Sequence, residues 1–240
     1  MHRPDARAVF VRPAHGPDAR AAFVRPAHGP DATIATPRLA RPSLLVGSPA
    51  ARAALITLVL GGAIGARWAA TVGGTSDGIA VGAAFGALLL TAAAVTGWRP
   101  GILPARSLVR IARTLAIGLV GGTALVVLAL ATRWPGPWLP FQPAASFLPW
   151  VAVTVLVATA EEVVLRGALF DALDEAGGTL VALAATSVVF ALLHVPLYGW
   201  HVVPLDLGVG LVLGGLRALT GGVAAPAVAH AVADLATWWI

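Results

Sequence analysis

The feature that most constrains this sequence is a series of apolar runs long enough to cross a lipid bilayer. The hydrocarbon layer is ~30 Å thick and takes about 20 residues of α-helix. Runs of this order recur from residue 53 onward. They predict an all-α fold, a polytopic membrane helix bundle with about seven transmembrane helices. The predicted spans are Ala53–Ala70, Gly78–Trp98, Leu115–Thr132, Phe147–Leu173, Thr179–Val195, Leu205–Leu216 and Gly222–Ile240.

Composition supports a membrane location and excludes several classes of function. Only 11% of the residues are charged, against roughly 25% in a soluble domain. The chain has no Cys, which excludes a disulfide framework, a thiolate metal site and a Cys nucleophile. Its positive charge comes from Arg alone and flanks apolar runs. That placement is typical of membrane orientation and contact with anionic lipid, so we expect the bilayer as a partner and no nucleic acid.

The basic residues also predict how the chain is oriented. The loop between the second and third spans is expected to carry Arg99, Arg106, Arg110 and Arg113. Basic loops tend to stay in the cytoplasm. Because two spans precede this loop, we expect the amino terminus to be cytoplasmic too, in a multi-pass protein of the plasma membrane.

Residues 1–42 are expected to form a disordered cytosolic extension ahead of a membrane domain over residues 43–240. The extension holds two nearly identical segments, Pro4–Gly16 and Pro17–Gly29. Two short copies rich in Pro, Arg and Ala cannot bury a core. His15 and His28 occupy equivalent positions in the copies, so they are interpreted as duplicated linker residues.

Several features predict where spans end. Arg67 lies near the end of the first span and is expected to reach the membrane interface beside Trp68. Trp134–Trp138 is expected to form an interfacial turn, and Pro196 to stop the fifth span. Four glycines of the sixth span, Gly208, Gly210, Gly214 and Gly215, are expected to allow close contact between helices.

The fourth span carries the strongest candidate site. Residues 134–160 contain no Asp, Glu, Lys or Arg, and Glu161, Glu162 and Arg166 follow directly. Ionisable groups at membrane depth are costly and usually face a bundle interior or a wet cavity. Glu162 and Arg166 are spaced i, i+4, which favours a helical ion pair. Glu161 then points elsewhere, so we expect Glu162 to be structural and Glu161 to be available for chemistry.

Two histidines on later spans can join this site. Glu161 and His194 lie at nearly equal distances in sequence from Gly177, so an antiparallel hairpin turning there would bring them to the same depth. His230 and Asp234 share one face of the last span, where the carboxylate can orient the imidazole. His201 is assigned to an interfacial loop, and Ser187 is interpreted as a packing residue.

Three motifs in order resemble the CAAX prenyl protease and bacteriocin-processing (CPBP, or Abi) family of intramembrane proteases. They are Glu161-Glu162-x-x-x-Arg166, Phe190-x-x-x-His194 and His230-x-x-x-Asp234, within residues 147–240. The resemblance implies helices around a hydrophilic cavity and an endopeptidase acting on membrane-associated protein or peptide substrates. By motif match, Glu161 and His194 would activate water and Glu162 and Arg166 would support the site. His230 and Asp234 would hold the oxyanion.

The resemblance leaves some questions open. Asn is common in the family at the position of Asp234, and an ionised Asp cannot donate a hydrogen bond, which favours orientation of His230 as its role. Glu161, His194 and His230 would suffice to bind Zn²⁺, as in a metalloprotease, but a metal-free mechanism is equally open. A non-catalytic scaffold or bacteriocin-immunity protein and a proton-coupled transporter are the alternative functions.

Overall fold

The computed structural model describes residues 48–72, 78–99, 108–132 and 146–239. Helices are the regular secondary structure throughout these ranges. They are α1 Pro49–Val72, α2 Gly78–Val95, α3 Leu108–Thr132, α4 Phe147–Glu162, the π-helix η1 Val163–Leu169, α5 Phe170–Gly177, α6 Thr179–Tyr198, the 3₁₀ turn η2 Trp200–Val202, α7 Val203–Thr220 and α8 Ala224–Ala236. The prediction of an all-α fold is confirmed.

Six of the described segments are long and apolar enough to cross a membrane. One of them is the continuous rod α4–η1–α5, over Phe147–Gly177. The segment predicted as the seventh span is α8, an apolar helix of 13 residues, shorter than the about 20 that a bilayer takes. The chain is a multi-pass membrane protein, and α8 packs in its bundle.

Several predicted boundaries were wrong. α3 begins at Leu108, so Arg110 and Arg113 lie on its first turns and not in a loop. α6 runs through Pro196 to Tyr198, because membrane helices tolerate a proline when neighbouring groups compensate the lost hydrogen bond. α7 begins at Val203 with Pro204 in its first turn, where the missing N–H costs nothing. The extension over residues 1–42, Arg106 and the turn at Trp134–Trp138 lie outside the described residues.

The hairpin between α5 and α6 forms where the sequence predicts it. Gly178 has a φ of 84°, a positive value that glycine adopts without steric cost. It stands between the last residue of α5 and the first of α6. The two helices therefore run antiparallel.

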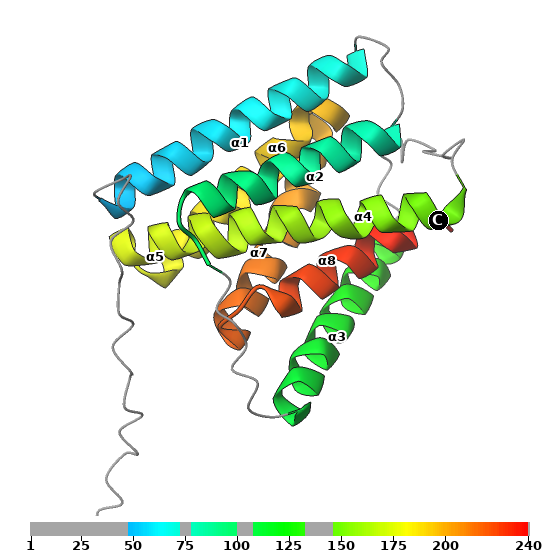
Figure 1. Ribbon diagram of the computed structural model, residues 1–240. Helices are drawn as coiled ribbons and strands as arrows, with labels where there is room; N and C mark the ends of the chain where they lie inside the picture. The colour runs from blue at the N-terminus through cyan, green and yellow to red at the C-terminus, as the bar shows by residue number, and fades with distance from the viewer. Residues whose placement is uncertain (1–47, 73–77, 100–107, 133–145, 240) are drawn as a thin grey trace, which may run out of the picture. The chain divides into compact units, whose positions relative to one another are not determined.

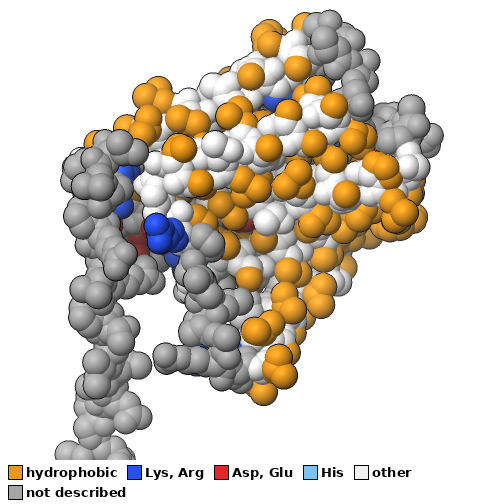
Figure 2. Space-filling view, viewed as in Figure 1, with side chains coloured by type: hydrophobic (Ala, Val, Ile, Leu, Met, Phe, Trp, Pro, Cys, Tyr) orange, Lys and Arg blue, Asp and Glu red, His pale blue; other side chains and the backbone are white. Residues whose placement is uncertain are grey.

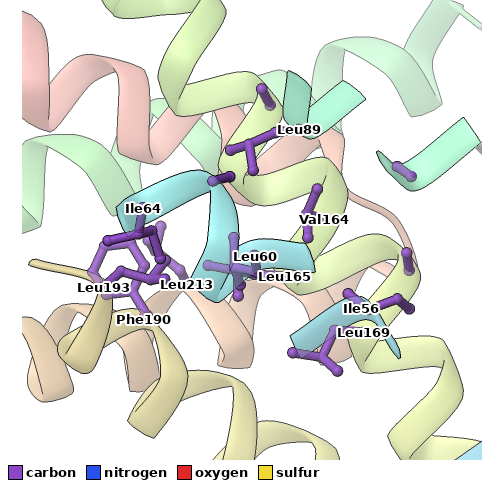
Figure 3. Close-up of a cluster of buried hydrophobic side chains, with 14 of the residues drawn as sticks. Ile56, Leu60, Ile64, Leu89, Val164, Leu165, Leu169, Phe190, Leu193 and Leu213 are labelled. Carbon is purple, nitrogen blue, oxygen red and sulfur yellow. The ribbon is translucent and has the colours of Figure 1, made fainter. Parts of the chain in front are cut away.

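Figure 1 shows how the helices pack. α1, α2 and α4 lie side by side in that order, and α3 packs against α8. The main apolar core surrounds η1, with Val164, Leu165 and Leu169 almost fully buried. Figure 3 shows these side chains meeting residues of α1 (Ile56, Leu60 and Ile64), α2 (Leu89), α6 (Phe190 and Leu193) and α7 (Leu213). This core holds the π-helix, and with it Arg166, at the centre of the bundle.

Close contact between α6 and α7 depends on only some of the predicted glycines. A Cβ atom added at Gly210 would lie 2.9 Å from the Ser187 Cα, and one at Gly214 would lie 3.3 Å from the Leu183 Cγ. At Gly208 and Gly215 an added Cβ would meet nothing within 4 Å. Gly210 and Gly214 therefore set the distance between the two helices.

We expect the substitution Gly210→Ala to destabilise the bundle by ~1–3 kcal/mol, because the added methyl group meets the α6 backbone. Gly215→Ala is the matched control on the same helix and should be at least as stable as the wild type. Thermal unfolding of both variants in one detergent checks this. Equal melting temperatures for the two variants would contradict the packing described here.

Candidate active site

The two adjacent carboxylates lie at the end of α4, where the rod passes into the π-helix. Glu161 is 5% exposed, and Glu162 and Arg166 are 0% exposed. Glu162 is the last α-helical residue, and Arg166 lies one turn further on, in η1. Both acids are therefore enclosed by neighbouring helices at the centre of the bundle.

Glu162 and Arg166 form the predicted i, i+4 ion pair. The Glu162 Oε1 atom is 2.9 Å from Arg166 Nη1. It also lies 3.0 Å from His230 Nδ1 on α8, so this one oxygen accepts from two helices. Arg166 Nη2 donates to the Gly210 carbonyl of α7 at 3.1 Å. The pair thus joins α4, η1, α7 and α8.

Phe190, on α6, lies between the polar side chains of the site. Its ring centroid lies 4.7 Å from the Arg166 guanidinium carbon, a cation–π contact. The same ring lies 4.8 Å from the His194 ring and 5.3 Å from the His230 ring, measured between centroids. The aromatic residue of the Phe190-x-x-x-His194 motif therefore touches three of the polar residues of the site.

Glu161 has one neighbour that the sequence did not predict, Arg67, and one that it did, His230. Its Oε1 atom lies 3.9 Å from Arg67 Nη1 of α1, and its Oε2 atom lies 3.9 Å from His230 Nε2. The Arg67 guanidinium also lies over the Phe85 ring, 4.7 Å from its centroid. The sequence did not predict these contacts: α1 turns Arg67 toward Glu161 and Phe85, where a carboxylate and an aromatic face stabilise its charge.

Glu161 and His194 line one pocket, which brings together the two residues predicted to share a depth. Its other walls are Ile64, Arg67, Phe85, Leu193 and Leu197. His194 Nδ1 lies 3.0 Å from the Phe190 carbonyl oxygen. A carbonyl can only accept a hydrogen bond, so Nδ1 carries the proton and the lone pair of a neutral ring is on Nε2. Asp206 Oδ2, 3.5 Å from Nδ1, supports the same tautomer.

Asp234 lies beside His230 but is not its closest partner. Asp234 Oδ2 is 3.5 Å from His230 Nε2, and the Asp234 side chain is 41% exposed. The buried Glu162, at 3.0 Å from Nδ1, holds the ring more tightly. Carboxylates thus face both nitrogens of His230, an arrangement in which an imidazolium can donate two hydrogen bonds.

The three residues considered as zinc ligands, Glu161, His194 and His230, do not form a metal-binding group. Within the part of the chain that the structure describes, no three His, Asp or Glu side chains converge as a metal site would require. The position beside Glu161 that a cation would take is next to the Arg67 guanidinium. These residues therefore do not fit a zinc site.

A second polar cluster, not predicted from the sequence, holds the other side of the π-helix. Arg217 of α7 donates from Nε to the Arg166 carbonyl at 2.7 Å and from Nη2 to Asp171 Oδ1 at 2.6 Å. Trp98 donates from its indole to Asp171 Oδ2 at 3.0 Å. The indole also covers Gly167, where an added Cβ would collide with it. These contacts fix the backbone around Arg166, the residue that pairs with Glu162.

Comparison with known proteins identifies the class of protein to which this site belongs. Residues 143–236 match the family described as type II CAAX prenyl endopeptidase Rce1-like. This region contains all three motifs and the whole Glu162–Arg166–His230 network. This region is thus similar to the Rce1-like family of CAAX-type membrane proteases, and the resemblance seen in the sequence is confirmed. No curated protein and no solved structure matches the chain.

The buried ion pair generates a stability prediction. Replacing Glu162 by Gln leaves the fully buried Arg166 charge without its partner, at an expected cost of ~3–5 kcal/mol. Glu175→Gln is the matched control, because Glu175 pairs with Arg52 at the surface, and exposed pairs contribute at most about 1 kcal/mol. Denaturant or thermal unfolding in detergent measures both. A Glu162→Gln protein as stable as Glu175→Gln would show that the buried pair is not required.

Proposed function

We propose that this protein is an intramembrane endopeptidase that hydrolyses peptide bonds of membrane-associated substrates through water activated by Glu161 and His194. The observation that carries the proposal is the pocket that these two residues share. One supplies a carboxylate base and the other an imidazole nitrogen with a lone pair. The match of residues 143–236 to a prenyl endopeptidase family supports the same reaction class.

Water activation would use both groups of the pocket. A water molecule held between Glu161 and His194 Nε2 donates one hydrogen bond to each. Glu161 takes the proton as the water oxygen attacks the scissile carbonyl carbon, a role of general bases in enzymes. Arg67, 3.9 Å from Glu161, keeps the carboxylate oriented toward the pocket. When the carbon–nitrogen bond breaks, Glu161 returns the proton to the leaving amine.

The negative charge that develops on the carbonyl oxygen requires donors placed in advance. His230 is suited to this role because its Nε2 atom lies 3.9 Å from Glu161 Oε2, beside the proposed base. Glu162 holds the other ring nitrogen, and Asp234 flanks Nε2 from the same helix. In this proposal Glu162, Arg166 and Asp234 are positioning residues and His230 is the donor. The Arg67 guanidinium, which lines the pocket, is a second donor.

A single substitution tests the proposed base. Glu161→Gln removes the proton acceptor but keeps the shape of the side chain, so turnover should fall at least ~10²-fold, the lower range for general acid–base catalysis. Unfolding should stay close to that of the wild type. The assay measures cleavage of a farnesylated CAAX-type peptide, with its unprenylated form in parallel, by purified protein in detergent. Wild-type turnover by the Glu161→Gln protein would exclude Glu161 as the base.

The histidines offer a matched pair for the same assay. His194→Ala removes a wall of the pocket and should abolish cleavage, whereas His201→Ala changes an exposed histidine in η2 and should not alter it. A scaffold or a transporter would show no cleavage in any variant, including the wild type. Equal loss in both histidine variants would indicate that the pocket is not the site of reaction.

A metal requirement is tested separately, on active protein. Because the candidate ligands do not converge, we expect full activity after exhaustive chelation, with zinc far below one equivalent per chain. Zinc content is measured by elemental analysis of the assayed sample. Activity that is lost on chelation and returns in proportion to added zinc would contradict the metal-free mechanism.

A further inference from the structure

Arg217 on α7 makes two hydrogen bonds to the rod formed by α4, η1 and α5. Its Nε atom donates to the Arg166 carbonyl oxygen at 2.7 Å, and its Nη2 atom donates to Asp171 Oδ1 at 2.6 Å. Both donors belong to one planar guanidinium group, which holds them in a fixed geometry. The guanidinium carbon also lies 5.1 Å from the centroid of the Phe170 ring, a cation–π contact. Arg217 is 7% exposed, so two acceptors and an aromatic face hold a buried cation.

The two residues that Arg217 joins are five positions apart, which is the spacing that a π-helix closes. The Phe170 amide shows this register, because it donates to the Leu165 carbonyl, five residues back, and to the Gly167 carbonyl, three residues back. An α-helical amide donates to the carbonyl four residues back, which for Phe170 is that of Arg166. Here Arg217 donates to the Arg166 carbonyl.

An α-helical register in Val163–Leu169 would not allow both hydrogen bonds. Five residues of α-helix turn through about 500°, so residues i and i+5 lie about 140° apart around the helix axis. Arg166 and Asp171 would then face different neighbours. The contacts of Arg217 therefore favour the π-helical register of this segment over the α-helical one.

The cluster of Arg217, Asp171 and Trp98 lies apart from the pocket of the candidate active site. The Trp98 indole donates to Asp171 Oδ2 at 3.0 Å, and the Asp171 side chain is 37% exposed. Figure 2 shows acidic and basic side chains at the surface of the end of the bundle where α5 lies, with hydrophobic side chains over the flanks of the helices. None of the three cluster residues lines the pocket. Any effect of the cluster on the reaction must therefore pass through the rod.

A continuous series of contacts leads from this cluster to the proposed oxyanion donor. Arg217 holds the Arg166 backbone, and the Arg166 side chain pairs with Glu162 Oε1 at 2.9 Å. The same oxygen lies 3.0 Å from His230 Nδ1. Arg166 lies within η1 and Glu162 lies before it, so a change of register in η1 would move one relative to the other. The His230 ring would then lose the acceptor that orients it.

We propose that Arg217 and Asp171 form a clamp that selects the π-helical register of η1 and so positions Glu162 and His230 for the reaction. Both clamp residues are positioning residues, because they act through Arg166 and do not touch substrate. The effect on turnover rests on the proposed endopeptidase function. The effect on register does not, because it follows from the hydrogen bonds of the rod alone.

The substitution Arg217→Lys tests the clamp, because lysine keeps the charge but lacks the planar group with two donors. In the cleavage assay described above, kcat should fall about 10-fold to 100-fold, the scale for a displacement of about 1 Å at a reacting centre. KM should stay at the wild-type value, because the residues that line the pocket are unchanged. Arg52→Lys is the matched control, since Arg52 pairs with Glu175 at the surface, and should alter neither constant. Wild-type kcat in the Arg217→Lys protein overturns the proposal.

Nuclear magnetic resonance tests the register without any need for activity. In protein that contains isotope-labelled histidine, the ring nitrogen signals of His230 report its contact with Glu162, and the His230→Gln protein assigns them. These signals should shift in Arg217→Lys and stay in place in Arg52→Lys. If wild-type protein cleaves no peptide but the signals shift as expected, the clamp stands and the proposed function fails. Unshifted signals in Arg217→Lys overturn the clamp, even where kcat falls.

Asp171 provides a second pair of variants, which keeps the test decisive if Arg217→Lys fails to fold. Asp171→Asn retains one side-chain oxygen that accepts from Arg217, whereas Asp171→Ala removes both acceptors. Asp171→Ala should therefore show the larger fall in kcat, at an unchanged KM, and the larger shift of the His230 signals. Wild-type kcat and unshifted signals in Asp171→Ala overturn the proposal.

Discussion

The buried ion pair between Glu162 and Arg166 is the interaction on which the arrangement of the site depends. Two charges at 0% exposure carry a large desolvation cost, and they remain buried only because neighbouring helices supply partners. α8 gives His230, α7 gives the Gly210 carbonyl and α6 gives the Phe190 ring. Pairs of this kind contribute little net stability compared with apolar packing. Here the pair fixes which faces of three helices turn toward α4.

The sequence predicted what lies within one helix better than what lies between helices. The Glu162–Arg166 pair follows from i, i+4 spacing, as does the approach of Asp234 to His230. The link from Glu162 to His230 and the inward turn of Arg67 did not follow. These contacts depend on how far each helix is rotated about its own axis. Hydropathy does not indicate that rotation in a membrane protein, because lipid is as apolar as a protein core. An apolar run surrounded by lipid and protein alike carries little information about which face is buried.

Backbone irregularities were the other features hidden from the sequence. No residue of the π-helix indicates its position in the sequence. Pro196 suggested the end of a helix, but α6 continues to Tyr198. By contrast, a glycine at the turn between α5 and α6 was predictable, because the positive φ of Gly178 favours glycine. The cluster of Arg217, Asp171 and Trp98 draws on three separate segments. No local spacing could have indicated it, although an Arg and an Asp inside apolar spans are themselves a signal of buried partners.

The π-helix also has a consequence for the tolerance of this chain to insertions and deletions. Hydrogen bonds from residue i to i+5 accommodate extra chain within a turn, and each residue added to or removed from a helix rotates everything beyond it by about 100°. Glu162 lies before η1 and Asp171 lies after it, and they face different partners, His230 and Arg217. The length of the Val163–Leu169 segment therefore determines how the face that carries Glu162 is oriented relative to the face that carries Asp171. A related chain with one residue fewer in this segment could keep the contact of Glu162 with His230 or that of Asp171 with Arg217, but not both.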